Sequence, residues 1–123
     1  MAFVMGNALM VVRADGEARE LYRLKEPERF YGWGTIMWTP DGRYILFVKK
    51  ANEKAPGELW SIPAEGGQAQ NLGVAMEDLI ELRVHPDGRR LAFTAGKRDA
   101  SEIWVMENFL PAAQPRKTSV TKR

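Results

Sequence analysis

A few side chains in this 123-residue sequence could do chemistry. His85 is the single histidine, and imidazole serves as a general base or a metal ligand in many proteins. Asp41 and Asp87 could act as paired carboxylates in acid–base catalysis or in metal binding. Both aspartates lie in the second position of a Pro-Asp-Gly segment, where Asp favours a turn, and His85 directly precedes one of these segments. We therefore interpret all three first as turn residues, with base or metal-ligand roles as the alternative.

A second group of residues could form a binding surface. Three acidic residues cluster just before and inside an expected strand and could hold a cation or a cationic ligand, although a solvated loop is the ordinary interpretation. The segment Tyr31-Gly32-Trp33-Gly34 places two large aromatic side chains between glycines at an expected strand entry. The candidate binding surface comprises Tyr31, Trp33, Glu77, Asp78 and Glu81.

The motifs of common enzyme classes are absent from the sequence. It contains no phosphate-binding loop, nucleophile elbow, HExxH pair or zinc-ligand spacing. One histidine and no cysteine give little basis for a catalytic triad or a thiol nucleophile. We expect no enzymatic activity, no cofactor and no metal site. The lack of cysteine also excludes disulfides, without indicating a compartment.

The charge balance argues against nucleic acid as a partner. Lys and Arg number 18 against 16 Asp and Glu, but four of the basic residues lie among the last eight positions. The high isoelectric point therefore reflects a short basic tail and not a basic face.

No stretch approaches the ~20 apolar residues of a membrane span, so we expect no membrane partner. The first residues lack the basic and long apolar regions of a secretory signal.

An internal repeat indicates which elements position these residues. Three pairs of segments realign at a nearly constant spacing, 38–47 with 84–93 (offset 46), 58–62 with 102–106 (offset 44) and 9–16 with 59–66 (offset 50). Repeats of this length fit four short strands each. We expect Trp60 and Trp104, at matching positions, to pack between repeats, with stacking on a ligand as the alternative.

The local chemistry of the repeat also predicts strands. In Pro40-Asp41-Gly42 and Pro86-Asp87-Gly88, Pro presets φ and Gly takes the left-handed position that closes a hairpin. The apolar runs 44–48 and 91–94 are too short for helices. Segment 73–82 has apolar spacing that would suit a helix, but its place in the repeat predicts entry into a strand.

The repeat divides the chain into parts with expected strands. The middle copy should have strands near 33–39, 43–49, 58–63 and 68–73, the last near 79–85, 89–95 and 101–107, and the first near 2–5, 8–13 and 18–24. The expected domains are a partial repeat at 1–25, a full repeat at 26–75, a repeat lacking its outer strand at 76–110, and a flexible basic tail at 111–123.

The pattern W-[ST]-P-D-G-[RK]-x-[IL]-x-F, followed by E-[LI]-W-x-[IM] and a Gly-Gly turn, resembles the repeat of TolB-like β-propellers. This WD-repeat-like group also supplies propeller domains to tricorn-type proteases and prolyl oligopeptidases. The resemblance covers roughly residues 2–110, with Val84-His85 in place of the usual Trp-Ser. Segment 104–111 resembles the C-terminal close of bacterial members. The resemblance implies an all-β fold of four-stranded antiparallel blades and a periplasmic or other extracytoplasmic setting.

A propeller ring closes with ~4–8 blades, whereas about two and a half are expected here. We therefore expect homo-oligomerisation, as a dimer or trimer, to complete the ring. The resemblance implies a non-catalytic interaction and scaffold module that binds a protein or peptide through its loops. The alternative is an accessory propeller domain of a larger enzyme, such as a propeller-bearing peptidase.

Overall fold

The computed structural model describes residues 1–31, 36–96, 102–110 and 119–122. Every regular element among these residues is a β-strand, and the strands form three antiparallel sheets. The expected all-β fold is therefore confirmed. In the described part of the chain there is no helix of the length and hydrophobicity that crossing a membrane requires.

The first sheet has three strands in the order β1-β2-β3. Their bounds are β1 (Ala2–Met5), β2 (Ala8–Val12) and β3 (Ala18–Arg23). These strands lie within a residue or so of the positions expected from the partial repeat.

The second sheet has the order β4-β6-β7-β8, with β5 also paired to β6. Its strands are β4 (Arg29–Phe30), β5 (Ile36–Trp38), β6 (Tyr44–Lys50), β7 (Gly57–Pro63) and β8 (Gln70–Met76). Because β4 pairs with the end of β6 and β5 with its middle, both lie along the same edge of β6. The sequence predicted one strand at this edge and missed β4, which has only two residues.

The third sheet has the order β12-β11-β10-β9. Its strands are β9 (Ile80–Val84), β10 (Arg90–Ala95), β11 (Glu102–Glu107) and β12 (Ser119–Lys122). The prediction that this blade lacks its outer strand was wrong, because β12 pairs antiparallel with β11. The β-branched Val120 and Thr121 favour a strand within a segment that was expected to be a flexible tail. Residues 111–118 lie outside the described ranges.

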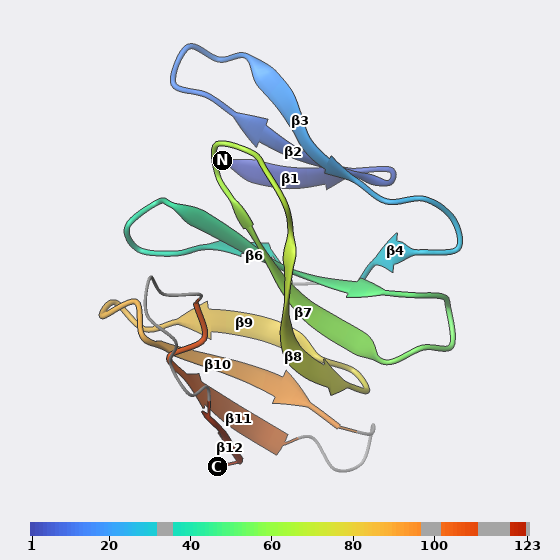
Figure 1. The fold of residues 1–123 in the computed structure, drawn as a ribbon, viewed down its shortest axis with the longest axis vertical. Helices are drawn as coiled ribbons and strands as arrows, with labels where there is room; N and C mark the ends of the chain where they lie inside the picture. The colour runs from blue at the N-terminus through green and yellow to red at the C-terminus, as the bar shows by residue number, and fades with distance from the viewer. Residues whose placement is uncertain (32–35, 97–101, 111–118, 123) are drawn as a thin grey trace.

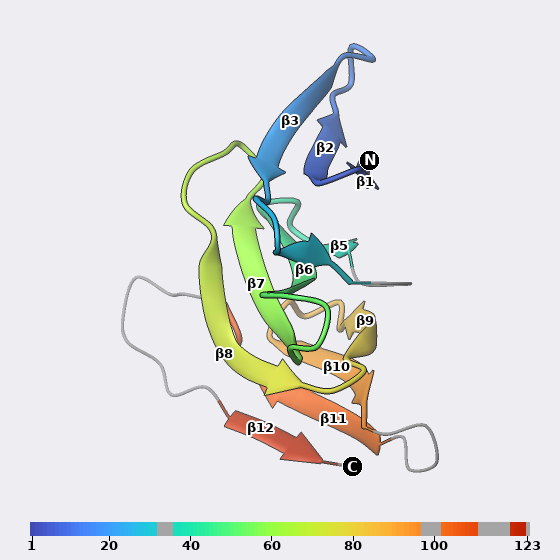
Figure 2. The same cartoon turned by 90° about the vertical axis from the view of Figure 1, so that its right-hand side faces the viewer.

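The three sheets stack one on another, with the first at the top of Figure 1 and the third at the bottom. Figure 2 shows β1, β5 and β9 along one side of the stack and β3 and β8 along the other. Each sheet thus has the arrangement of a propeller blade, with an inner and an outer edge.

Two apolar clusters hold the blades together. Side chains alternate across a strand, so Ile45 and Phe47 of β6 face the first blade while Leu46 and Val48 face the third. All four are fully buried, which explains the continuous apolar run of β6. The repeat also appears in the strand pairing, where Phe47 lies opposite Trp60 in one blade and Phe93 opposite Trp104 in the next. Trp60 packs against the cluster between the first and second blades, and Trp104 packs against the cluster between the second and third blades.

A buried lysine connects the first and second blades. The Lys49 side chain is only 6% exposed, and its Nζ donates hydrogen bonds to Glu28 Oε2 (2.8 Å) and to the Tyr22 hydroxyl (3.2 Å). The same ammonium lies 3.9 Å from the centroid of the Trp60 ring, within range of a cation–π contact. These contacts join β3, β6 and β7 to the segment between the first two blades.

Candidate functional site

The strand ends divide the molecule into two sets of loops (Figure 1). The Pro-Asp-Gly turns between β5 and β6 and between β9 and β10 lie on the left of the view. The β1–β2 turn, the β6–β7 loop and the β8–β9 connection lie on the right. Glu77 and Asp78 of the candidate binding surface lie in the β8–β9 connection of the right-hand set, with Glu81 at the start of β9 and Tyr31 hydrogen-bonded to Asp78. The turn residues belong to the left-hand set.

On the right-hand end, the structure brings together two residues of the candidate surface. The Tyr31 hydroxyl donates a 2.8 Å hydrogen bond to Asp78 Oδ1, although the two residues are 47 positions apart in sequence. This hydrogen bond, together with burial and the carboxylate charge, raises the pKa of Tyr31 above its ordinary value. The phenol therefore stays protonated and neutral at physiological pH.

The other acidic residues of the candidate surface do not meet at one point. Glu81 Oε2 accepts a hydrogen bond from Thr94 Oγ1 (3.3 Å), and the Glu77 backbone carbonyl accepts one from the Gly96 N–H (2.9 Å). Asp78 and Glu81 have positive φ angles of 51° and 56°, which place their side chains at sharp bends of the backbone. Among the described residues, no group of three or more acidic or histidine side chains is placed to hold a metal ion. Trp33 lies outside the described residues.

Sequence reasoning missed the basic residues beside the Tyr31 side chain. Lys50 Nζ lies 4.9 Å from the centroid of the Tyr31 ring, a cation–π distance. A pocket of about 410 Å³ opens next to them and spans two blades, lined by Val4, Gly6, Asn7, Arg29, Phe30, Tyr31, Lys50 and Glu53. The available signal was the pair Lys49-Lys50 at the end of the apolar run 44–48, since neighbouring side chains on a strand point to opposite faces.

At the left-hand end, the first Pro-Asp-Gly turn is closed by a compact set of hydrogen bonds. The Gly42 N–H donates to the Thr39 carbonyl (2.9 Å), and Asp41 Oδ1 accepts from Thr39 Oγ1 (2.6 Å) and from the Arg43 N–H (3.0 Å). The hydroxyl and backbone donors lower the pKa of Asp41. This carboxylate therefore supports the turn above its unfolded pKa of about 4, and the support is lost as the pH falls through its lower folded pKa.

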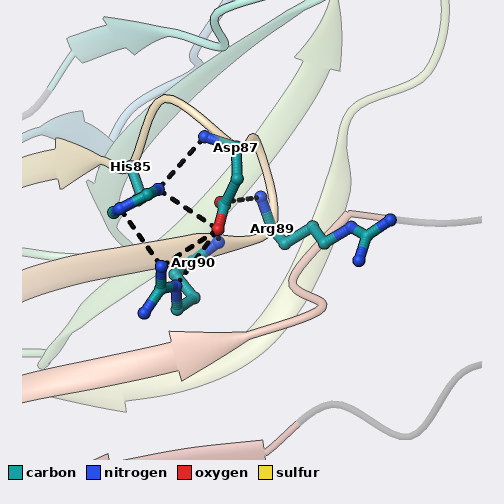
Figure 3. Close-up of polar contacts among 4 residues, drawn as sticks. All are labelled: His85, Asp87, Arg89 and Arg90. Carbon is teal, nitrogen blue, oxygen red and sulfur yellow. Dashed lines mark hydrogen bonds and ion pairs between the residues drawn. The ribbon is translucent and has the colours of Figure 1, made fainter.

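The second turn repeats this geometry, with His85 in the place of Thr39 (Figure 3). The Gly88 N–H donates to the His85 carbonyl (2.9 Å), and Asp87 Oδ1 accepts from the Arg89 N–H (2.8 Å). The Arg89 backbone donor, the His85 ring and the Arg90 side chain lower the pKa of Asp87.

Both nitrogens of the His85 ring are engaged within the turn. Nε2 lies 3.1 Å from Arg90 Nη2, a group that can only donate. Nδ1 lies 3.1 Å from the Asp87 backbone nitrogen, whose N–H donates to it, and 3.1 Å from Asp87 Oδ2 (Figure 3). Ring nitrogens that already face Arg90 and Asp87 within the turn are poorly placed to take a proton from a substrate or to bind a metal. This arrangement favours the turn interpretation of His85 over the general-base one.

Gly42 provides a direct check of the turn. Its φ is 72°, and a Cβ added there would meet nothing within 4 Å, so a substitution changes backbone strain without a clash. We expect Gly42→Ala to lower the free energy of unfolding by about 1–2 kcal/mol, because L-residues disfavour the left-handed region. Gly42→Asn should recover part of this loss, since Asn tolerates that region better. Urea unfolding of the three proteins measures the effect, and an alanine variant as stable as the parent would contradict it.

Comparisons with known proteins agree with this architecture. The sequence matches no protein-family profile and no curated protein sequence. The structure is similar to the crystal structure of TolB from Acinetobacter baumannii, with a TM-score of 0.64 and 20% identity over 84% of this chain and 25% of that one. It is also similar to a protein assigned as TolB from Agrobacterium tumefaciens, with a TM-score of 0.66 and 15% identity over 92% of this chain and 40% of that one.

This chain therefore spans less than half the length of either TolB structure. At these identities the likeness concerns the fold, and it confirms the resemblance to TolB-like propellers that the repeat motifs predicted. The three described sheets do not close a ring by themselves.

Proposed function

We propose that this chain is a non-catalytic interaction module of propeller blades, which joins other copies of itself in a closed ring and presents loops to a protein or peptide partner. The observation that carries the recognition role is the surface around Tyr31. There an aromatic ring, fixed by Asp78 and flanked by Lys50, lies beside a pocket of about 410 Å³ shared by two blades.

The chemistry of this surface suits a peptide. A tyrosine ring offers a broad apolar face at low entropic cost, and such residues are enriched where proteins bind one another. Arg29 and Lys50 line the same pocket as Glu53, so the pocket offers more positive than negative charge. A peptide that inserts an apolar side chain against Tyr31 and places a carboxylate near the two cations would satisfy both features.

Selection from a phage-displayed library of random peptides tests this role. We expect selected peptides to carry an acidic residue next to an apolar one, and to lose binding about tenfold or more to the Lys50→Glu variant. Fluorescence anisotropy with labelled copies of the selected peptides measures the dissociation constants.

Arg43→Glu supplies the matched control for that experiment. It makes the same charge reversal at an exposed position on the opposite end of the strands, and binding should stay unchanged. Peptides whose affinity responds to Arg43 and not to Lys50 would contradict the proposed location.

Ring formation has a separate readout in the mass of the particle. Propellers close with ~4–8 blades, and two copies of three blades would fall within this range. Native mass spectrometry over a concentration series should therefore show a discrete dimer that resists dilution. A monomer at all concentrations would overturn the self-assembly part of the proposal.

A further inference from the structure

The blades pack on one another through two recurring faces. The leading face of a blade is turned toward the next blade along the chain, and the trailing face is turned toward the preceding blade. The leading face contains Leu9 and Val11 in β2, Leu59 and Ser61 in β7, and Ile103 and Val105 in β11. The trailing face contains the alternate residues, Met10 and Val12 in β2, Trp60 and Ile62 in β7, and Trp104 and Met106 in β11. These positions correspond to one another through the sequence repeat, so each blade presents the same kind of face on the same side.

The same contact occurs twice within the chain. Leu9 and Val11 share an apolar cluster with Ile62 and Trp60, so the leading face of the first blade meets the trailing face of the second. Leu59 shares a cluster with Met106 and Trp104, so the second blade meets the third in the same way. One trailing face and one leading face remain at the two ends of the stack (Figure 1).

The remaining trailing face belongs to the first blade. Phe3 lies opposite Met10 across β1 and β2, as Phe47 lies opposite Trp60 in the second blade. Phe3 and Met10 are both partly exposed, whereas Phe47 is completely buried. The first blade thus carries the apolar pair that elsewhere fills a contact between blades.

The remaining leading face belongs to the third blade and is hollowed. Ile103 is 56% exposed, although Leu59 at the matching position is fully buried. Ala92 stands where the second blade has Leu46, which leaves room for an incoming side chain. A pocket of about 370 Å³ results, lined by Arg83, Val84, His85, Arg90, Ala92, Ile103 and Val105.

We propose that a second copy of this chain docks Phe3 and Met10 into the pocket beside Ile103, repeating the contact already made twice between blades. This inference rests on the ring assembly proposed above and names the surfaces that would form it. In a two-copy ring the trailing face of each copy would contact the leading face of the other. The same contact would then occur twice, and the assembly would close.

Cross-linking tests the contact directly, because the chain has no cysteine of its own. Packed sheets lie about 10 Å apart, so a bismaleimide of about that span fits between thiols placed on facing sheets. Met10→Cys and Ile103→Cys proteins, refolded together, should give a covalent dimer with the reagent. Either variant alone should give little, and Ile103→Cys refolded with Asn52→Cys, on an exposed loop, is the control for random collisions.

A charge at the same position gives a second test. Ile103 is largely exposed within one chain, so Ile103→Lys should leave each copy folded and raise the dimer dissociation constant at least about tenfold. Circular dichroism checks the fold and analytical ultracentrifugation measures the association. A monomeric parent protein would overturn both this contact and the ring. A dimer that tolerates Ile103→Lys and cross-links through other positions would overturn only the contact proposed here.

Discussion

Phe47→Ala is expected to lower the free energy of unfolding by about 3–5 kcal/mol, the usual cost of removing a buried phenylalanine ring. The Phe47 side chain is completely buried. Its ring lies 5.3 Å from that of Tyr22 and 5.7 Å from that of Phe30, measured between centroids. These neighbours belong to β3 of the first blade and β4 of the second. If they moved to fill the cavity that the ring leaves, the contact between the two blades would be disturbed. Urea unfolding followed by far-ultraviolet circular dichroism measures the loss.

Phe47→Leu tests whether the loss of stability follows the size of the cavity. It keeps most of the volume, and we expect it to cost clearly less than the alanine change, about 1–2 kcal/mol. Val4→Ala, at an exposed residue of β1, should change stability by less than about 0.5 kcal/mol. If Phe47→Ala cost no more than this control, the first two blades would not share a core.

Lys49→Ala should have the second largest effect, a loss of about 2–3 kcal/mol. The change removes a buried aliphatic stem, worth about 0.8 kcal/mol per methylene, together with the ammonium that lies over Trp60. Lys49→Met keeps the stem and should cost only about 1 kcal/mol. Because Glu28 is 36% exposed, its carboxylate can reach water when the lysine is gone, which limits the penalty. The free energies come from denaturant unfolding at neutral pH.

The same residue predicts how stability depends on pH. Burial lowers the pKa of Lys49, but hydrogen bonds to Glu28 and Tyr22 outweigh it, and the pKa lies above its ordinary value. A raised pKa means that the ammonium contributes its full stability below the unfolded value of about 10.4, and loses it as the pH rises through the folded pKa. The advantage of the parent over Lys49→Met should therefore be constant from pH 7 to about 9 and shrink above about 10.4. A gap between the two proteins that grows in alkali would contradict this assignment.

Lys50→Ala is the matched control, since the neighbouring lysine lies on the opposite side of β6 and over the Tyr31 ring. Its loss should be within about 0.5 kcal/mol, as expected for a partly exposed cation. Equal losses at the two positions would mean that the buried ion pair adds nothing beyond an ordinary surface charge.

The repeat allowed much of the fold to be predicted from the sequence. Matching Trp60 with Trp104 and Phe47 with Phe93 predicted equivalent strands, and the structure pairs these residues across β6–β7 and β10–β11. Such local patterns work because hairpins join strands that are adjacent in sequence. The repeat failed where the chain departs from it, in the two-residue β4 and in β12, which follows a proline-containing and basic stretch.

The candidate site was less accessible to sequence reasoning. Tyr31 and Asp78 were both expected at a binding surface, but their hydrogen bond depends on how the second blade meets the third. The contact of Lys49 with Glu28 likewise joins β6 to the segment between blades, 21 residues earlier in the chain. Nothing in local spacing indicates such contacts, since they arise from packing between sheets and not from strand periodicity.

The separation of the two loop sets has a consequence for how such a protein can evolve. The Thr39–Asp41 and His85–Asp87 contacts that close the turns involve none of the residues around Tyr31, which lie at the opposite ends of the strands. Substitutions that alter the recognition proposed for the Tyr31 surface can therefore accumulate at one end while the hairpins at the other stay intact. The protein could then change its proposed partner during evolution without passing through an intermediate sequence that fails to fold.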